Sequence, residues 1–218
     1  MGTTTDLLFA SGVLTEREGD LTLSPAVEET VEEYETHVSG LGRPELAEYI
    51  HDRIGNAAAI EPLADLGLKD PRMVAELSAL ADAVEAPVEE WLPLLPVLRL
   101  VRTDHPPTRG VPLPFIPVPG DLVPNLARIY ARLLVYIWLD DCPPCDALKE
   151  RLETVFDGPT GVLLVAVYGP DHKEFLASEY DVTGGPALLF MRDGDVDSRL
   201  YGDQDERVIA NEVERILE

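Results

Sequence analysis

The chain has 218 residues, 45% of them hydrophobic, which suits one large globular domain or two small ones. Its 41 acidic and 17 basic residues give a formal net charge of −24, which disfavours binding to nucleic acid or to an anionic membrane, because phosphate contacts require clusters of lysine and arginine. No apolar run approaches the roughly 20 residues that cross a bilayer, and the N-terminus lacks the basic and apolar regions of a signal peptide, so we predict a cytoplasmic protein.

The acidic residues are distributed over both halves of the chain rather than gathered in a tail. Lysine is rare and occurs only as Lys69, Lys149 and Lys173. A uniformly acidic, lysine-poor surface on a chain with an ordinary core is typical of proteins from a salt-loaded cytoplasm, as in halophilic archaea. The alternative is an acidic protein from an organism without high internal salt.

Residues 1–103 predict an all-α N-terminal domain with one small hairpin. Ser24 and Pro25 are typical of a helix start, with serine as the N-cap and proline in the first turn. Apolar periodicity predicts helices over residues 5–11, 25–38, 46–54, 57–66 and 71–84. A hairpin turn at Gly19-Asp20 would suit a winged-helix DNA reader, but the charge disfavours that interpretation. We therefore expect a packing module, through which the chain could form a homo-oligomer.

Residues 104–120 are predicted to form a proline-rich connector between two domains. Seven prolines lie between residues 104 and 124, which is typical of a semi-rigid extended segment. Val111, Phe115 and Ile116 are too apolar for a solvated linker, however. Part of the connector is therefore expected to lie against one or both domains, with an edge strand as one option, because proline is tolerated there.

Residues 121–218 alternate strands with helices, and this pattern predicts an α/β sandwich. The expected strands span residues 133–139, 162–168, 187–191 and 196–200. The expected helices span residues 121–132, 147–156, 171–179 and 205–217.

Cys142 and Cys145 are the only cysteines, and they stand between a predicted strand and a predicted helix. The first N–H groups of a helix lack intrahelical partners and point at whatever lies before them. They stabilise a thiolate, which is the reactive form of cysteine. In a reducing cytoplasm a cysteine pair is more often catalytic or metal-binding than structural. Strand, Cys-x-x-Cys and helix together therefore predict a redox-active dithiol.

Several ordered features of residues 110–218 resemble the thioredoxin family. Trp138 lies four residues before the first cysteine, and Pro144 stands directly before the second. Pro186 occupies the place of the family's cis-proline, at the opening of a strand. The family's hairpin turn and the glycine that ends its last strand are matched by Asp193-Gly194 and Gly202. The resemblance implies a thioredoxin-like sandwich over residues 121–218, with a mixed central sheet flanked by helices.

The resemblance also implies roles for individual residues. Cys142 would be the exposed nucleophile that forms a mixed disulfide with a substrate, and Cys145 the more buried thiol that resolves it. Pro186 would hold the loop that faces the cysteines, through a cis peptide bond. The supporting positions are Trp138, Asp141, Pro143, Pro144 and Gly185. The implied activity is dithiol–disulfide oxidoreduction, with protein disulfides as substrates, a separate reductant, and no metal or other cofactor.

Four departures from the family pattern surround the dithiol, one of which is the missing lysine on the next strand, because residues 162–168 carry no charge. The aromatic residue expected before the first cysteine is Asp141, the buried aspartate that assists proton transfer is replaced by Tyr136, and the proline five residues after the second cysteine is Glu150. Carboxylates also crowd the pair, at Asp140, Asp141 and Asp146. Each favours the protonated thiol and thus opposes the helix start, which favours the thiolate.

Two other interpretations are open at this stage. A non-catalytic thioredoxin-fold module, used for interaction or redox sensing, would account for the acidic surroundings and the missing aspartate. The retention of both cysteines and of Pro186 disfavours it. A metal site would need ligands beyond the two thiols, and only His172 is a plausible addition.

Overall fold

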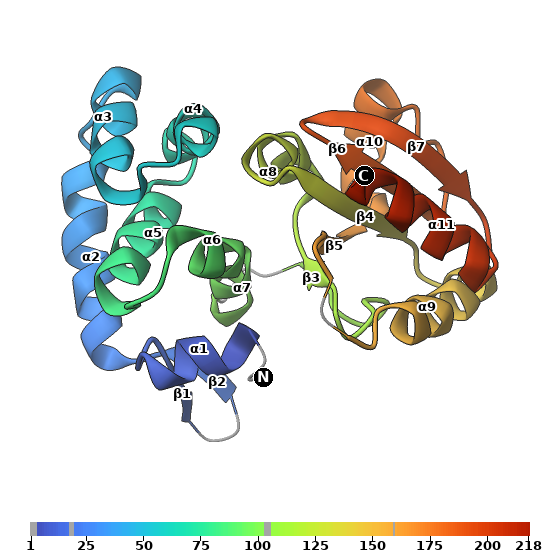
Figure 1. Ribbon diagram of the computed structural model, residues 1–218, viewed down its shortest axis with the longest axis horizontal. Coiled ribbons are helices and arrows are strands. Elements are labelled where there is room, and N and C mark those ends of the chain that lie inside the picture. Colours follow the sequence, from blue (N-terminus) through green and yellow to red (C-terminus); the bar gives the residue numbers. More distant parts are fainter. Residues whose placement is uncertain (1–3, 18–19, 103–105, 159) are drawn as a thin grey trace. The chain divides into compact units, whose positions relative to one another are not determined.

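The computed structural model describes residues 4–17, 20–102, 106–158 and 160–218, and it divides into two compact units, Met1–Asp104 and His105–Glu218 (Figure 1). Gly19 of the predicted hairpin turn lies outside the described residues, as do Asp104 and His105 at the start of the predicted connector. Within the described ranges, no helix combines the length and the apolar character needed to cross a membrane.

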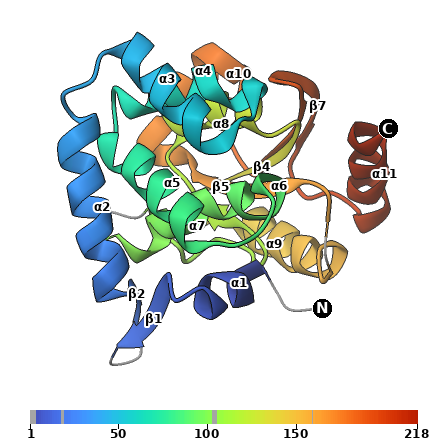
Figure 2. The ribbon, with the colours of Figure 1, turned by 60° about the vertical axis from the view of Figure 1, so that its left-hand side comes forward.

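The first unit consists of helices and one hairpin, which confirms the mostly helical character predicted for it. β1 (Leu14–Arg17) and β2 (Asp20–Leu23) pair in antiparallel fashion, as the sequence predicted. The helices are α1 (Thr4–Ala10), α2 (Pro25–Val38), α3 (Arg43–Ile54), α4 (Ala57–Gly67), α5 (Pro71–Ala83), α6 (Val88–Trp91) and α7 (Leu95–Leu98). Helices α2 and α5 pack against each other (Figure 2). Short 3-10 turns at Leu92–Leu94 and Arg99–Val101 follow α6 and α7, because prolines in this stretch prevent one continuous helix.

An ion-pair network ties the end of the first unit to α5. Glu76 on α5 is fully buried, and its two carboxylate oxygens accept hydrogen bonds from Arg102 at 2.9 and 2.6 Å. Arg102 also donates to Asp70 at 2.8 Å, and Arg99 donates to the same oxygen at 2.6 Å. Burial raises the pKa of Glu76. Burial acts on Asp70 in the same direction, but its hydrogen bonds to arginine outweigh that effect and lower the pKa of Asp70.

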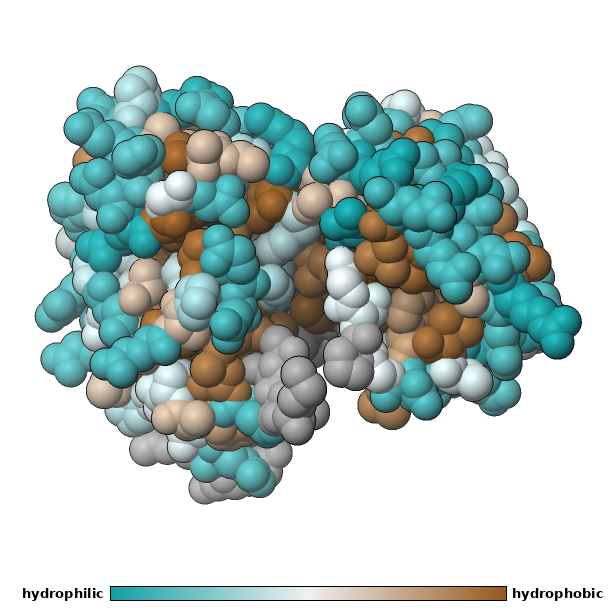
Figure 3. Space-filling model, viewed as in Figure 1, coloured by the Kyte–Doolittle hydropathy of each residue, from teal (hydrophilic) through white to brown (hydrophobic). Residues whose placement is uncertain are grey.

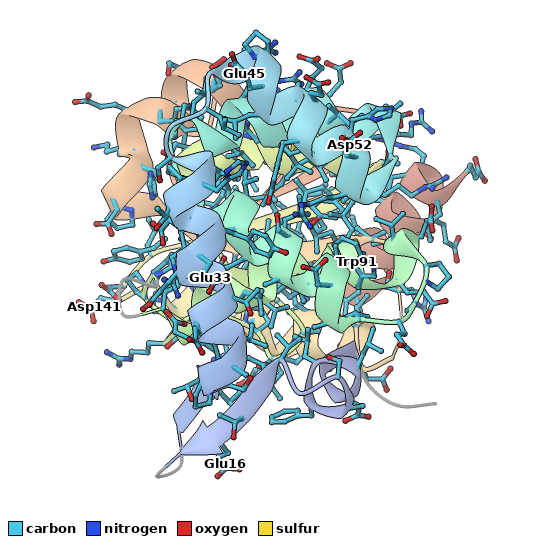
Figure 4. All side chains as sticks on the ribbon, turned by 90° about the vertical axis from the view of Figure 1, so that its left-hand side faces the viewer. Glu16, Glu33, Glu45, Asp52, Trp91 and Asp141 are labelled. Atoms are coloured by element: carbon cyan, nitrogen blue, oxygen red, sulfur yellow. A yellow bond between two sulfur atoms is a disulfide. The ribbon has the colours of Figure 1, made fainter. Side chains whose placement is uncertain are left out.

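Acidic side chains are exposed on the first unit. Glu16, Glu33, Glu45 and Asp52 are exposed and project outward in Figure 4. Hydrophilic side chains predominate on the visible face of each unit in Figure 3. Much of the negative charge therefore lies at the surface, where dissolved salt can screen it.

The second unit is a five-stranded mixed sheet flanked by helices, in agreement with the predicted α/β sandwich. The strand order is β3–β5–β4–β6–β7, in which β3, β5 and β4 are parallel and β6 and β7 complete the sheet in antiparallel fashion. The strands are β3 (Ile116–Pro117), β4 (Arg132–Trp138), β5 (Leu163–Tyr168), β6 (Ala187–Arg192) and β7 (Asp195–Tyr201). The helices are α8 (Val123–Ile129), α9 (Pro143–Val155), α10 (Lys173–Tyr180) and α11 (Glu206–Leu217). Helices α9 and α11 cover one face of the sheet, and α8 and α10 the other (Figure 1).

The central strand β4 is buried on both faces. Leu134 and Tyr136 belong to the core that α9 and α11 cover, together with Leu148 and Ile209 from those helices. The alternate residues of β4, such as Val135, are equally buried toward the opposite face. This double burial explains why the strand is a continuous apolar run in the sequence.

Three predicted helices of this unit were wrong in extent. The helix expected over residues 147–156 begins four residues earlier, because α9 spans Pro143–Val155. The helix expected over residues 121–132 is a 3-10 turn at Gly120–Leu122 followed by α8, which ends at Ile129. Arg132 already belongs to β4, where it pairs with Arg192 of β6. Pairing between distant strands decides this boundary, and local periodicity does not contain that information. The helix expected over residues 171–179 likewise begins as a 3-10 turn, Gly169–His172, before α10.

The proline-rich segment contributes an edge strand to the second unit. Ile116 pairs with Val165 of β5, and Pro117 occupies the edge of the sheet, where its missing N–H does not interrupt the ladder. Phe115 is buried and packs edge-on against Tyr136, with ring centroids 6.2 Å apart. This part of the segment is therefore an integral element of the sandwich.

Candidate active site at the cysteine pair

The two cysteines lie at the start of α9 and form a disulfide. Their sulfur atoms are 2.06 Å apart and their Cα atoms 5.2 Å apart. Cys142 is the N-cap of α9, and its Sγ accepts a hydrogen bond from the Cys145 N–H at 3.3 Å. Asp141 precedes the pair in a left-handed conformation with φ 49°, which aspartate tolerates better than most residues. The N–H that faces Cys142 would stabilise a thiolate there after reduction.

The two sulfur-bearing residues differ in their access to solvent. Cys142 is partly exposed, whereas only 3% of the Cys145 surface is exposed. Cys145 lies on the buried face of α9 and packs in the core with Leu148. A substrate disulfide could therefore reach Cys142 directly, whereas Cys145 is accessible mainly to Cys142.

Tyr136 lies directly beneath the buried cysteine. Its hydroxyl donates a hydrogen bond to the Cys145 carbonyl oxygen at 3.0 Å, and its side chain is fully buried. Burial raises the pKa of Tyr136, and the negative charge of Asp146 raises it further. The phenol is therefore neutral at physiological pH. A neutral hydrogen-bond donor thus stands where the resemblance would place a buried carboxylate.

An aromatic pair borders the other side of the site. The ring of Trp138, the last residue of β4, lies 4.8 Å from that of Tyr168 at the end of β5. The Tyr168 hydroxyl donates to the Asp140 carboxylate, and this hydrogen bond raises the pKa of Tyr168. The interaction ties the loop after β4 to the neighbouring strand. Asp141, by contrast, is exposed and projects from the surface (Figure 4).

The Gly185–Pro186 peptide bond is cis, as expected from the resemblance. Ala187 pairs with Ile137 in the sheet, so Pro186 lies level with the end of β4. Gly185 approaches the same end so closely that a Cβ there would lie 3.2 Å from Leu139 Cγ. The Pro186 carbonyl accepts a hydrogen bond from the Gly202 N–H at 2.8 Å. The loop is therefore held beside the strand end from which the cysteine loop departs.

A cleft of about 360 Å³ opens beside the disulfide. Of the residues predicted for the site, five line the cleft: Trp138, Asp141, Cys142, Pro143 and Cys145. Pro144, Gly185 and Pro186 lie outside its lining. The remaining lining residues are Arg109, Gly110, Tyr136, Leu139, Asp140 and Asp146. The structure thus gathers the dithiol, its acidic neighbours and one arginine around a single opening.

Arg109 and Gly110 are, apart from Leu139, the lining residues that the sequence did not single out. They belong to the proline-rich segment, more than 30 positions before the cysteines. The available signal was the apolar content of that segment, which indicated packing but not its location. His172, the only additional metal ligand considered, lies in the 3-10 turn before α10 and does not line the cleft. Within the described residues, no three histidine, cysteine or acidic side chains form a group that could hold a metal ion.

Comparison with known proteins agrees with this geometry. A family model described as Thioredoxin matches residues 125–215. Probable thioredoxin-2 of Caenorhabditis elegans is 32% identical over 97 residues, which cover 44% of this chain and 67% of that protein. The chain belongs to the thioredoxin family.

Two further matches are also to thioredoxins. The mitochondrial thioredoxin of Bos taurus is 38% identical over 65 residues, which cover 30% of this chain and 39% of that protein. A mutant thioredoxin from Halobacterium salinarum NRC-1 has a solved structure that covers 50% of this chain and 96% of its own, with 24% identity and a TM-score of 0.42. The Thioredoxin model match begins at residue 125, so the first unit and the proline-rich segment lie outside it.

The carboxylates beside the thioredoxin dithiol lead to a prediction about salt. Reduced Cys142 should react with iodoacetamide faster in about 3 M KCl than in about 0.1 M KCl, because the Debye length falls from roughly 10 Å to under about 3 Å. This screening weakens repulsion from Asp140, Asp141 and Asp146 more than it weakens the direct contact with the helix N–H. The measurement is the alkylation rate, with free cysteine as the control for the reagent. Equal rates at the two salt concentrations would contradict the prediction.

Proposed function

We propose that this protein is a dithiol–disulfide oxidoreductase that exchanges disulfides with protein substrates through Cys142 and Cys145. One observation carries the proposal: a partly exposed cysteine at a helix start is disulfide-bonded to a buried cysteine one turn away. In this arrangement a substrate disulfide can contact the exposed sulfur of Cys142, and the buried sulfur of Cys145 remains available to attack Cys142 afterwards. Membership of the thioredoxin family supports the same activity.

The proposed reaction moves two electrons from the reduced dithiol to a substrate disulfide. The Cys142 thiolate attacks one substrate sulfur, so that a mixed disulfide forms and the other substrate sulfur leaves as a thiolate and takes up a proton. Cys145 then loses its proton and attacks the Cys142 sulfur. The intramolecular disulfide forms, and the second substrate thiol is released. A separate reductant of the dithiol class must restore the pair.

Proton transfer from Cys145 requires a route that does not use position 136. The Tyr136 hydroxyl is neutral and already donates to the Cys145 carbonyl, so it offers no free base. Tyr136, Cys145 and Asp146 line the same cleft, which opens beside the disulfide. In this proposal, the proton of Cys145 passes to water in the cleft.

We also place the reaction in a salt-rich cytoplasm. The net charge of −24 and the presence of only three lysines support this setting. High salt would screen the carboxylates that surround the reactive thiol and would thereby favour its ionised form. The salt dependence of alkylation described above tests the electrostatic part of this proposal.

The experiment that tests the activity is a redox titration of the full chain in about 3 M KCl, the high-salt condition of the screening argument. Glutathione or dithiothreitol buffers would set the redox potential, and maleimide gel shifts would count free thiols. We expect a reversible two-electron transition with a midpoint roughly between −180 and −270 mV, the range of known exchangers. The same preparation should then reduce a protein disulfide in the presence of dithiothreitol.

A non-catalytic thioredoxin-fold module is the second candidate. It is favoured by the neutral Tyr136 beneath Cys145 and by the three carboxylates around the cleft. Two thiols that never form a reversible disulfide in the titration would support this candidate and would contradict the oxidoreductase. A reversible disulfide that reacts with no protein substrate would support a redox sensor.

A further inference from the structure

The segment before β3 forms a fixed strap along α9. The strap comprises residues 108–115. At its start, a turn is closed by the Val111 N–H, which donates to the Thr108 carbonyl at 3.0 Å. At its end, Phe115 is buried and packs edge-on against Phe156, with ring centroids 5.7 Å apart. The strap precedes residue 125, where the Thioredoxin match begins, so it is a feature added to the matched part of the chain.

Two side chains of α9 hold the backbone of the strap. Lys149 Nζ donates to the Arg109 carbonyl at 3.2 Å. The Glu153 carboxylate accepts a hydrogen bond from the Leu113 N–H at 3.2 Å. Lys149 and Glu153 lie one turn apart on the helix that begins with the cysteine pair. The strap is therefore fastened to the element that carries the dithiol.

Gly110 determines how closely the backbone of the strap approaches the ring of Trp138. A Cβ at this position would be 2.1 Å from Cε3 of the Trp138 ring, which is far inside any real contact. The backbone of the strap thus rests directly on the indole, and only glycine permits this approach. Since Trp138 lines the cleft, this contact brings the neighbouring Arg109 to the opening.

Charged groups around Cys142 are mostly negative. Asp140 and Asp141 come from the loop after β4, and Asp146 comes from the first turn of α9. The other titratable groups of the lining are neutral Tyr136 from β4 and Cys145 itself. Arg109, from the strap, is the one cationic side chain among the described residues that line the cleft. Its guanidinium is always charged.

We propose that Arg109 is a positioning residue for the dithiol, whose guanidinium stabilises the Cys142 thiolate against the three neighbouring carboxylates. The inference rests on the proposed function, in which that thiolate is the attacking group. A positive charge near a thiol favours its ionised form, as the N–H groups of the helix start do. The strap supplies this charge from outside the matched thioredoxin residues, and its anchors to α9 and Trp138 hold the Arg109 backbone beside the cleft that Arg109 lines.

The test compares the pH dependence of iodoacetamide alkylation of the reduced full chain in about 0.1 M KCl, where screening is weak. Arg109→Gln should raise the apparent pKa of Cys142 and slow alkylation roughly three- to tenfold below that pKa, with the rate at high pH unchanged. Arg109→Lys should restore most of the rate. In about 3 M KCl the difference between Arg109→Gln and the unaltered chain should shrink.

Two further variants distinguish the effect of the Arg109 charge at the cleft from the effects of net charge and of strap position. Arg192→Gln removes one positive charge at the other end of the sheet, where Arg192 pairs with the first residue of β4, and it should leave the Cys142 profile unchanged. Gly110→Val keeps Arg109 but displaces the strap, so it should shift the profile in the direction of Arg109→Gln. Circular dichroism would confirm that each variant is folded.

An unchanged Cys142 profile in folded Arg109→Gln would overturn the proposal and would mean that the guanidinium is solvated without effect on the thiol. An equal shift in Arg192→Gln would also overturn it, since net charge alone would then be responsible. The readout is the acidity of a thiol and requires no turnover. If the redox titration fails while the Arg109 effect is present, the proposed function is wrong and the electrostatic inference stands. If the redox titration succeeds and Arg109→Gln leaves the Cys142 profile unchanged, the proposed function stands and only the inference about Arg109 is wrong.

Discussion

Replacing Cys142 with serine will abolish disulfide exchange, whereas replacing Cys145 with serine will stop the reaction at a covalent intermediate. A serine hydroxyl remains protonated at physiological pH and cannot replace the Cys142 thiolate as the attacking group. In the Cys145→Ser variant the exposed sulfur is retained, so the first attack proceeds. The mixed disulfide should then accumulate, because no second thiol of the chain is left to resolve it.

The loss of turnover in the Cys145→Ser variant is expected to be at least about a thousandfold at millimolar external thiol, because an intramolecular group acts with an effective concentration of about 10⁵ M or more. Non-reducing gels and intact mass spectrometry would detect the adduct between the chain and a protein substrate. The double variant Cys142→Ser/Cys145→Ser is the matched control, since it also lacks the disulfide but has no sulfur to form an adduct. An adduct in Cys142→Ser, or none in Cys145→Ser, would contradict the assigned roles.

Replacing Arg102 with methionine will destabilise the first unit by about 3 kcal/mol, because it removes the main partner of a buried carboxylate. Glu76 is fully buried, and the Arg102 side chain is 9% exposed. Burial opposes the charge on Arg102, but its bonds to Glu76 and Asp70 outweigh burial and raise the pKa of Arg102. Methionine retains the packing of the side-chain stem, so the measured loss reports mainly the missing charge. Arg72 still contacts Glu76 at 3.2 Å. We therefore expect the loss in the free energy of unfolding to lie at the lower end of the range for breaking a buried ion pair.

Urea denaturation followed by circular dichroism would measure this loss, at a fixed high salt concentration. Arg43→Met is the matched control, because Arg43 pairs with Glu61 and Asp65 on the surface of the same unit and should cost much less. The double variant Arg102→Met/Glu76→Gln removes the buried charge together with its partner and should recover part of the loss. Equal losses in Arg102→Met and Arg43→Met would show that burial does not strengthen the network.

The arrangement at the cysteine pair could be predicted from sequence because it is encoded by neighbouring residues. An apolar strand, two cysteines three positions apart and an amphipathic helix place a thiol at a helix start in any compact fold. The cis bond at Pro186 was expected from the resemblance to the thioredoxin family, and the structure contains it. Helices α1 to α5 of the first unit were predicted for the same reason, since their caps and periodicity are properties of short windows, whereas α6 and α7 were not predicted.

The features that could not be predicted depend on contacts between distant residues. The end of α8 is decided by the pairing of Arg132 with Arg192, 60 positions later in the chain. The network around Glu76 joins α5 to an arginine 26 positions further along, although a glutamate on a helix ordinarily predicts an exposed side chain. In both cases, the residues around one partner in the sequence do not indicate which distant residue it contacts.

The cysteine pair, its helix start, its acidic neighbours and the α/β class of residues 121–218 could all be predicted from the sequence, because each depends on residues close together along the chain. What surrounds the dithiol depends instead on the fold. The fold placed the neutral Tyr136 hydroxyl under the buried cysteine, and it laid Gly110 on Trp138 so that Arg109 lines the cleft. The physical reason is that the charge and solvation of a thiol depend on distances in space, and folding brings those groups together from separate parts of the sequence.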